Sequence, residues 1–284
     1  MPLLNKELRQ QFVREGYLLA RDVLPRDVLG AVVQSIERAV EQRAQELLKN
    51  GKISKLHDDA PIQYRWQRIV AEMGSQQTRR SWDDEIIGES LFELMRHPKL
   101  LDIVESLIGP EVIATGMIAV RPKIPGDKRT TVLWHQDSQY FGADSQTQTI
   151  LTIWLPLVRS TEQNGCMQII PGSNQWGLQP FEKDTEANVL RPVEDPERRG
   201  KAILCEMEVG DILAFSNLTY HRSLENNSDH TRWSIDLRYC SPQTTFSRMP
   251  QFIPSFVARS QSQPAESWNG WQSKVSQWQK PTVA

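Results

Sequence analysis

The chain has 284 residues, with 33 Lys and Arg against 35 Asp and Glu, which gives a formal net charge of −2. This balance argues against a nucleic-acid partner, because proteins that bind nucleic acid usually carry a basic face. No apolar run approaches the roughly 20 residues that a membrane-spanning helix needs, and the charged N-terminus is unlike a secretory signal. Cys166, Cys205 and Cys240 suit neither a disulfide framework nor a zinc cluster, so we expect buried thiols in a cytoplasmic protein.

The first hundred residues carry helical patterns. Apolar residues recur at gaps of three and four from Val28 to Leu48, which predicts a long amphipathic helix that stops at Asn50-Gly51. Two further helices are expected, about Asp84–Met95 and over Pro98–Ile108. Residues 61–82, which are rich in Arg and Trp, fit the wall of a pocket for an anionic or zwitterionic molecule, but a solvated helix face is the more common use of such charges.

From residue 112 onwards the pattern changes to short runs rich in Val, Ile, Thr and aromatic residues, bounded by Pro, Gly, Asn and Ser, as strands are. The runs are Val112–Val120, Thr149–Leu157, Gln168–Ile170, Ala202–Leu204, Ile212–Phe215 and Trp233–Tyr239. Many short strands without intervening helices predict a mainly β protein with N-terminal helices, whose strands form a double-stranded β-helix, or jelly roll.

We expect a single domain over residues 1–284, with a helical part at 1–110, a jelly-roll core at 111–245 and a C-terminal cap at 246–284. Polar residues 174–200 form a long excursion between strands, which suggests a lid or a side insertion. In the cap, Trp268, Trp271, Val275 and Trp278 recur at helical spacing. This stripe predicts a helix that packs on the core, with a cap over the barrel as the alternative.

The segment Leu133-Trp134-His135-Gln136-Asp137 places an imidazole and a carboxylate two residues apart. On a strand, such residues point to the same side and can bind one ion. His221, which follows a turn and an apolar strand, is the natural third ligand. Two histidines and one carboxylate leave coordination positions open, as iron(II) requires if it is to bind an oxoacid and O₂. A His-X-Asp triplet by itself, however, is more often a surface pair.

Arg232 lies eleven residues after His221 and opens the last apolar strand. An arginine near a metal can form two hydrogen bonds to a carboxylate and thereby fix the far end of a dicarboxylic cosubstrate. Taken alone, Arg232 fits a surface strand residue better. Together with the three candidate ligands, it favours a metal site that uses such a cosubstrate.

Several motifs, taken in order, resemble the phytanoyl-CoA dioxygenase family. They are His135-Gln136-Asp137-Ser138-Gln139-Tyr140-Phe141, Trp154, Asn164-Gly165-Cys166-Met167-Gln168-Ile169-Ile170-Pro171-Gly172-Ser173, and His221 with Arg232. Residues 5–24, with Phe12 and Gly16-Tyr17-Leu18, also look like the family's N-terminal opening. The resemblance spans most of residues 5–240 and is densest over 109–240.

The resemblance implies a jelly-roll oxygenase with Fe(II) on His135, Asp137 and His221. It also implies that 2-oxoglutarate is held through Arg232 at its distal carboxylate. Relatives that halogenate carry a small residue where this chain has Asp137, so hydroxylation or another oxidation by O₂ is expected, with release of succinate and CO₂.

By matching motif positions, the resemblance implies four further cosubstrate contacts, at Ser223, Trp154, Gln136 and Met117. Met117 and Trp154 also fit core strand residues. A basic residue that some family members place before the third helix has no clear equivalent here, since Ser81 falls near that position.

The substrate is expected to be a small polar metabolite or a natural-product intermediate rather than a long acyl-CoA, with neither nucleic acid nor membrane as a partner and with a monomer or homodimer as the active form. Two alternatives stay open. The same cofactors can support desaturation, demethylation or ring formation, or the chain is a jelly-roll binding protein without turnover.

Overall fold

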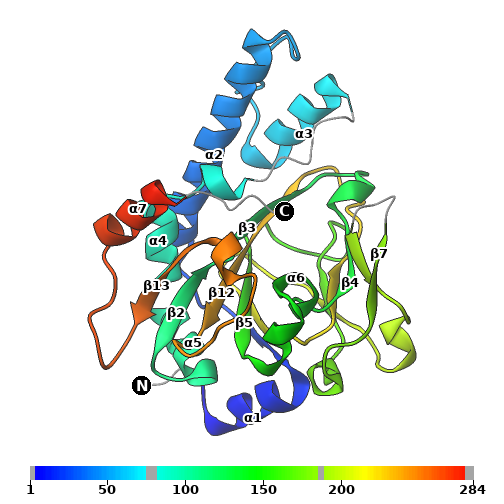
Figure 1. Ribbon diagram of the computed structural model, residues 1–284. Coiled ribbons are helices and arrows are strands. Elements are labelled where there is room, and N and C mark those ends of the chain that lie inside the picture. The colour runs from blue at the N-terminus through cyan, green and yellow to red at the C-terminus, as the bar shows by residue number, and fades with distance from the viewer. Residues whose placement is uncertain (1–3, 75–81, 185–188, 279–284) are drawn as a thin grey trace.

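The computed structural model describes residues 4–74, 82–184 and 189–278. Antiparallel strands form two sheets, and Figure 1 shows the smaller one on the opposite side of the molecule from helices α4 and α7. The larger, seven-stranded sheet has the order β1-β10-β5-β12-β2-β13, with β3 also paired to β12, and the smaller one has the order β4-β11-β6-β9. This arrangement confirms the predicted fold class, a jelly roll with N-terminal helices.

The larger sheet draws strands from most of the chain. They are β1 (Tyr17–Ala20), β2 (Val112–Gly116), β3 (Ala119–Lys123), β5 (Ile150–Pro156), β10 (Ile212–Ser216), β12 (Arg232–Cys240) and β13 (Ile253–Arg259). Strands β1 and β13 come from outside the range 111–245 that was expected to hold the sheet. Each lies at an edge of the sheet and buries an apolar side chain, Leu18 and Phe256 respectively, so each adds to the same core.

The smaller sheet comes from the middle of the chain. Its strands are β4 (Val132–His135), β6 (Met167–Ile169), β9 (Ile203–Cys205) and β11 (His221–Ser223). A separate hairpin of β7 (Phe181–Asp184) and β8 (Val189–Pro192) lies within the polar excursion 174–200. The predicted run Val112–Val120 is divided between β2 and β3 after Gly116, where a Cβ atom would lie 1.7 Å from the Ile253 carbonyl oxygen of β13.

Most of the helices lie against the outer face of the larger sheet, and α2 and α3 extend beyond it (Figure 1), whereas the short α6 lies on the inner side of that sheet, with its Phe141 ring against Arg238. They are α1 (Lys6–Glu15), α2 (Arg26–Lys49), α3 (Ile62–Met73), α4 (Glu89–Met95), α5 (Pro98–Ile108), α6 (Ser138–Phe141) and α7 (Trp268–Gln277), with short 3-10 turns between several of them. The long helix and the one from Pro98 are confirmed. The pattern at Asp84–Met95 begins as a 3-10 turn over Asp83–Glu85, and α4 starts only at Glu89, after Gly88, whose backbone is extended.

Strand β12 separates the core from the barrel interior. Its odd-numbered residues, from Trp233 to Tyr239, join the apolar core beneath the helices. Its even-numbered residues, from Arg232 to Arg238, are polar and face the other way, since alternate side chains of a strand point to opposite faces. On α7, Trp271 is fully buried against Phe92 and Phe256, so the C-terminal aromatic stripe packs on the core as predicted.

Two expectations from composition can also be compared with the structure. The three cysteines are buried and unpaired. Among the described helices, none combines the length and the apolar character needed to cross a membrane.

Candidate active site

His135 and His221 are brought together by strand pairing. His135 is the last residue of β4, His221 is the first of β11, and the two are direct partners in the antiparallel register. Their ring centroids are 4.1 Å apart. The Nε2 atoms of His135 and His221 lie 3.7 Å and 3.8 Å from Oδ1 of Asp137, and one ligand atom from each residue lies within 4.8 Å of the others. The three predicted ligands therefore converge on one buried point.

Backbone carbonyls orient both imidazoles. Nδ1 of His135 is 2.8 Å from the Leu133 oxygen, and Nδ1 of His221 is 2.9 Å from the Thr219 oxygen. A carbonyl only accepts, so each Nδ1 carries the proton and each Nε2 lone pair is directed toward the shared point, as in metal-binding histidines. Burial, together with the neighbouring His135, lowers the pKa of His221 to about 3, so that this ring is neutral near pH 7.

Asp137 reaches the same point in a way that the sequence did not predict. The strand ends at His135, and Asp137 adopts helical backbone angles as the residue before α6, so the strand geometry assumed for the triplet is wrong. The carboxylate is held from behind at Oδ2, where Thr152 donates at 2.6 Å and Arg238 at 3.2 Å. Burial alone would raise the pKa of Asp137, but Arg238 and the two imidazoles outweigh it and hold the pKa well below its usual range.

Arg232 lies on the wall of a narrow cavity beside these three residues. Its side chain is buried, and its Nε and one terminal nitrogen have no hydrogen-bond partner. The same cavity is lined by Ser223 and by Trp154, whose ring centre lies 5.0 Å from the guanidinium carbon. Buried unsatisfied donors are costly, so this pair of nitrogens is suited to an acceptor that comes from outside the chain.

A wider cavity of about 340 Å³ opens on the other side of the ligand residues. Met117, Phe141 and Phe252 provide much of its apolar wall, and Val189 of the β7–β8 hairpin closes part of its rim. The narrow cavity encloses only about 30 Å³, but the two share Arg121, Val132, His135 and Arg238 in their linings. A dicarboxylate of the size of 2-oxoglutarate therefore fits only if it extends across this shared boundary or displaces lining side chains.

The other two predicted cosubstrate contacts, Met117 and Gln136, do not line the narrow cavity. Met117 lines the wider cavity and not the narrow one that contains Arg232. Gln136 points away from both. Its Nε2 donates to the carbonyls of Gly177 and Leu218 at 2.9 Å and 2.6 Å, and its Oε1 accepts from the Gln179 backbone, so it ties together the loops around the site. Ser81 lies outside the described residues.

Residues that the sequence analysis missed come mainly from one face of β12. Asp236 and Arg238 lie on the same face as Arg232, and Arg121 of β3 pairs with Asp236 at 3.0 Å. The sequence does contain a pattern that indicates these residues, because polar residues alternate with apolar ones along Arg232–Cys240. A period of two with charges on one side is typical of a strand with one face directed toward a polar site.

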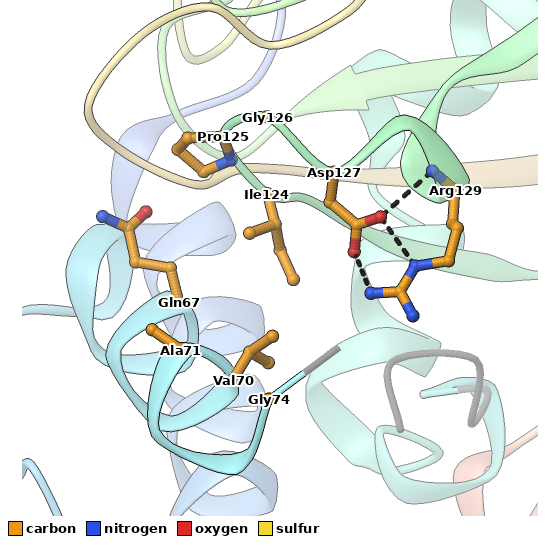
Figure 2. Close-up of a pocket in the computed structure, with 9 residues that line it drawn as sticks. All are labelled: Gln67, Val70, Ala71, Gly74, Ile124, Pro125, Gly126, Asp127 and Arg129. Carbon is orange, nitrogen blue, oxygen red and sulfur yellow. Dashed lines mark hydrogen bonds and ion pairs between the residues drawn. The ribbon is translucent and has the colours of Figure 1, made fainter. Parts of the chain in front are cut away.

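The segment 61–82 does not reach the metal residues where it is described. Figure 2 shows that Gln67, Val70 and Ala71 of α3 instead line a separate depression of about 620 Å³, closed on its other side by residues 124–129. Arg129 there is held by Asp127, with Nε at 2.8 Å from its carboxylate (Figure 2). The described lining contains no histidine or cysteine, so the narrow and wide cavities at His135 are the better candidates for catalysis.

Two imidazoles and one carboxylate, with a buried guanidinium alongside, match the donor set of iron(II) enzymes that use a dicarboxylic oxoacid. The fold and the site define an Fe(II)- and 2-oxoglutarate-dependent dioxygenase. The sequence profile described as "Phytanoyl-CoA dioxygenase (PhyH)" matches residues 12–234, and the chain belongs to this family. The resemblance noted in the sequence is thereby confirmed.

Curated relatives agree with this assignment. "Probable phytanoyl-CoA dioxygenase" of Caenorhabditis elegans is 26% identical over 247 residues, which cover 84% of this chain and 76% of the relative. "Phytanoyl-CoA dioxygenase, peroxisomal" of Homo sapiens is 22% identical over 248 residues, covering 84% and 69%. "Ectoine dioxygenase" of Bordetella parapertussis is 21% identical over 257 residues, covering 85% and 77%.

Solved structures share the fold at low identity. The non-heme monooxygenase ThoJ aligns with a TM-score of 0.61 at 19% identity and covers 95% of this chain and 98% of its own. The epimerase SnoN, in complex with Fe³⁺, α-ketoglutarate and nogalamycin RO, aligns with a TM-score of 0.53 at 18% identity, covering 89% and 85%. These likenesses support the jelly-roll fold and do not specify the reaction of this chain.

Proposed function

We propose that this protein hydroxylates a small-molecule metabolite or natural-product intermediate, with Fe(II) held by His135, Asp137 and His221. The reaction consumes 2-oxoglutarate and O₂ and releases succinate and CO₂. The observation that carries the proposal is the position of the three ligand atoms, which lie where a narrow cavity with an unpaired guanidinium meets a wider and mostly apolar cavity.

The narrow cavity is proposed to hold the cosubstrate. Arg232 and Ser223 are suited to its distal carboxylate, because both present donors in the same cavity. Trp154 supplies a flat wall beside the guanidinium. Met117 is better suited to the substrate side and Gln136 to support of the loops, so the cosubstrate roles implied for these two residues receive no support from the positions of their side chains.

Bound iron supplies the oxidising chemistry, by activating O₂ at the expense of the oxoacid. The chain's own residues prepare the site for the metal. Thr152 and Nε of Arg238 donate to Oδ2 of Asp137, whereas Oδ1, which also accepts a longer 3.5 Å hydrogen bond from Nη2 of Arg238, faces the two imidazoles. The two backbone carbonyls fix the ring tautomers, and burial keeps bulk water away from the ligand atoms.

The wider cavity is proposed to bind the substrate. Its wall is largely apolar, and the ion-paired side chains of Arg121 and Arg238 add polar groups near His135 and Asp137, which suits a compact molecule that carries polar groups. Tyr140, whose ring meets His135 edge to face at 5.4 Å, lies next to the backbone of Leu190 and so brings the β7–β8 hairpin close to the site. This contact supports a covering role for residues 174–200, which stays a prediction.

The proposal is tested first without substrate. Anaerobic addition of Fe(II) and 2-oxoglutarate to the purified protein should give a weak visible charge-transfer band, and its absence would favour a binding protein without turnover. Aerobic incubation with candidate metabolites should then release succinate, and the product mass separates the outcomes. A gain of one oxygen supports hydroxylation, whereas loss of two hydrogens or of a carbon unit supports desaturation or demethylation with the same cofactors.

Two expectations remain predictions. These are the cytoplasmic location and the choice between monomer and homodimer. The mammalian relatives are named as peroxisomal, so the location is best decided by fractionation of the source cells. The oligomeric state is measurable by light scattering.

A further inference from the structure

Lys123 is a buried lysine directly opposite Arg232. It lies on β3, where the antiparallel register pairs it with Arg232 of β12, and each of the two residues is only 1% exposed. Directly opposite residues of an antiparallel pair place their side chains on the same face of the sheet. Two cationic side chains therefore lie side by side within the barrel.

The surroundings of Lys123 hold its side chain in place. Its Nζ donates to the Thr130 carbonyl at 2.8 Å, and Thr130 lines the narrow cavity. Its Cδ packs so closely on Gly165 that a Cβ atom at that position would lie 2.5 Å away. The glycine of the Asn164-Gly165 motif thus leaves room for the lysine stem.

The charges around the pair are unbalanced. Among the described residues, no carboxylate lies within ion-pair distance of Lys123 or Arg232. Burial lowers the pKa of Lys123 to about 6, with Arg232 and Arg121 lowering it further and only Glu225 opposing. Burial likewise lowers the pKa of Arg232 to about 10, against the influence of Asp236. Two buried cations without an ion-pair partner are costly to ionise together, and a bound dianion would relieve that cost.

We propose that Lys123 is a positioning residue of the cosubstrate site, which adds a second positive charge behind Arg232 and takes up one proton when 2-oxoglutarate binds. The inference rests on the proposed role of Arg232. The step balances as a neutral amine plus a proton plus the dicarboxylate dianion, which together give an ammonium group beside the bound dianion. Lys123 acts through the electric field and through Thr130, without direct contact.

A pH dependence follows from this proton uptake. Below about pH 6, Lys123 is already charged before the cosubstrate arrives. Above that pH, binding must also draw a proton from the solvent, so the dissociation constant for 2-oxoglutarate rises with pH, by up to tenfold per unit. The other charged groups near Lys123 are Arg232, Arg121 and Glu225, and both guanidinium groups keep their charge between pH 6.5 and 8.5, since the pKa of Arg232 is lowered only to about 10 and that of Arg121 is raised.

The test measures cosubstrate binding to the Fe(II)-loaded protein under anaerobic conditions. Calorimetry at pH 7.5 in phosphate and in Tris, two buffers with different ionisation enthalpies, reports how many protons are taken up. The charge-transfer band reports the dissociation constant from pH 6.5 to 8.5. We compare the wild type with Lys123→Met, which keeps the length of the stem without the amine. Lys128→Met, on the exposed turn of the same segment, is the matched control.

The expected result is an uptake close to one proton by the wild type and by Lys128→Met, and close to none by Lys123→Met, whose affinity should no longer vary with pH. If Lys123→Met does not fold, the proton uptake and the pH profile of the wild type still test the inference. Binding without proton uptake and with a flat pH profile overturns the inference about Lys123 and leaves the proposed function intact. A wild type that binds no 2-oxoglutarate at any pH overturns the proposed function itself.

Discussion

The two cavities that meet at the metal residues differ in what holds them. The narrow one is lined mainly by side chains of paired strands, among them β3, β11 and β12, so strand register fixes the positions of Arg232, Asp236 and Arg238, which are all buried. The wider one is closed by α6, by the β7–β8 hairpin and by the segment before β13, and its wall is mostly apolar. The first therefore specifies a cosubstrate chemistry, while the second leaves room for many substrates. The residues of the narrow cavity therefore indicate the class of enzyme, whereas those of the wider cavity are compatible with many substrates.

The largest expected effect is loss of the metal. His221→Ala removes one of three ligands from a site whose remaining imidazole and carboxylate bind iron weakly by themselves, so we expect no stoichiometric Fe(II) after anaerobic desalting, and no charge-transfer band. His230→Ala, on a histidine outside both cavities, should retain one iron per chain. Retention of iron by His221→Ala would show that the triad is not the metal site.

The next effect separates the cosubstrate from the metal. Arg232→Ala should leave Fe(II) binding nearly unchanged and weaken 2-oxoglutarate about tenfold to a hundredfold, because a hydrogen bond to a charged group contributes about 1.5–3 kcal/mol. Titration of the charge-transfer band measures this change. Arg159→Ala, on an exposed arginine, serves as the control. Equal cosubstrate affinity in the Arg232 variant and the wild type would contradict the assignment.

A smaller effect on metal affinity is expected from the residues that hydrogen-bond to the carboxylate of Asp137. Arg238→Met removes one of the two donors to Oδ2 of Asp137 and keeps much of the side-chain volume. Loss of such a supporting contact typically costs about tenfold to a hundredfold in metal affinity, and Thr152 still holds the same oxygen here, so we expect the lower end. Competition with a chelator measures the affinity. Thr152→Val removes the other donor and should give a loss of similar size, whereas an unchanged affinity in both variants would leave Asp137 without the support we assign.

How far the sequence predicts this molecule depends on the range of the interactions. Helix α5 coincides with its predicted bounds, because Pro98 and Gly109 mark its ends within the segment itself. Strands β1 and β13 were missed, since a strand of four residues such as Tyr17–Ala20 is defined by its partner β10, almost two hundred residues away. Residues within a helix are enough to predict where the helix begins and ends. The edge strands of a sheet, in contrast, can be recognised only once their partner strands are known.

The same distinction applies to the site. The three residues predicted to bind the metal came from a motif together with a family resemblance, and they lie close together even though the backbone at Asp137 is helical and not a strand. The support from Thr152 and Arg238 was not predicted, because it requires the register of β5 against β12. Motifs thus identify candidate metal ligands, while the residues that orient them become visible only when the strands are paired.

The smallest expected effect tests the independence of the two cavities. Phe252 lies on the wall of the wider cavity, with its ring edge against Phe141, and outside the lining of the narrow one. Phe252→Leu keeps an apolar side chain but enlarges the cavity, so we expect Fe(II) and 2-oxoglutarate affinities within twofold of the wild type and a melting temperature lower by a few degrees, since the ring is half-buried. Differential scanning fluorimetry and the charge-transfer titration measure the two quantities. If the variant instead bound 2-oxoglutarate ten times more weakly, the cosubstrate would have to reach past the residues that the two cavities share as far as Phe252, and the separation between a fixed cosubstrate side and an adaptable substrate side would fail.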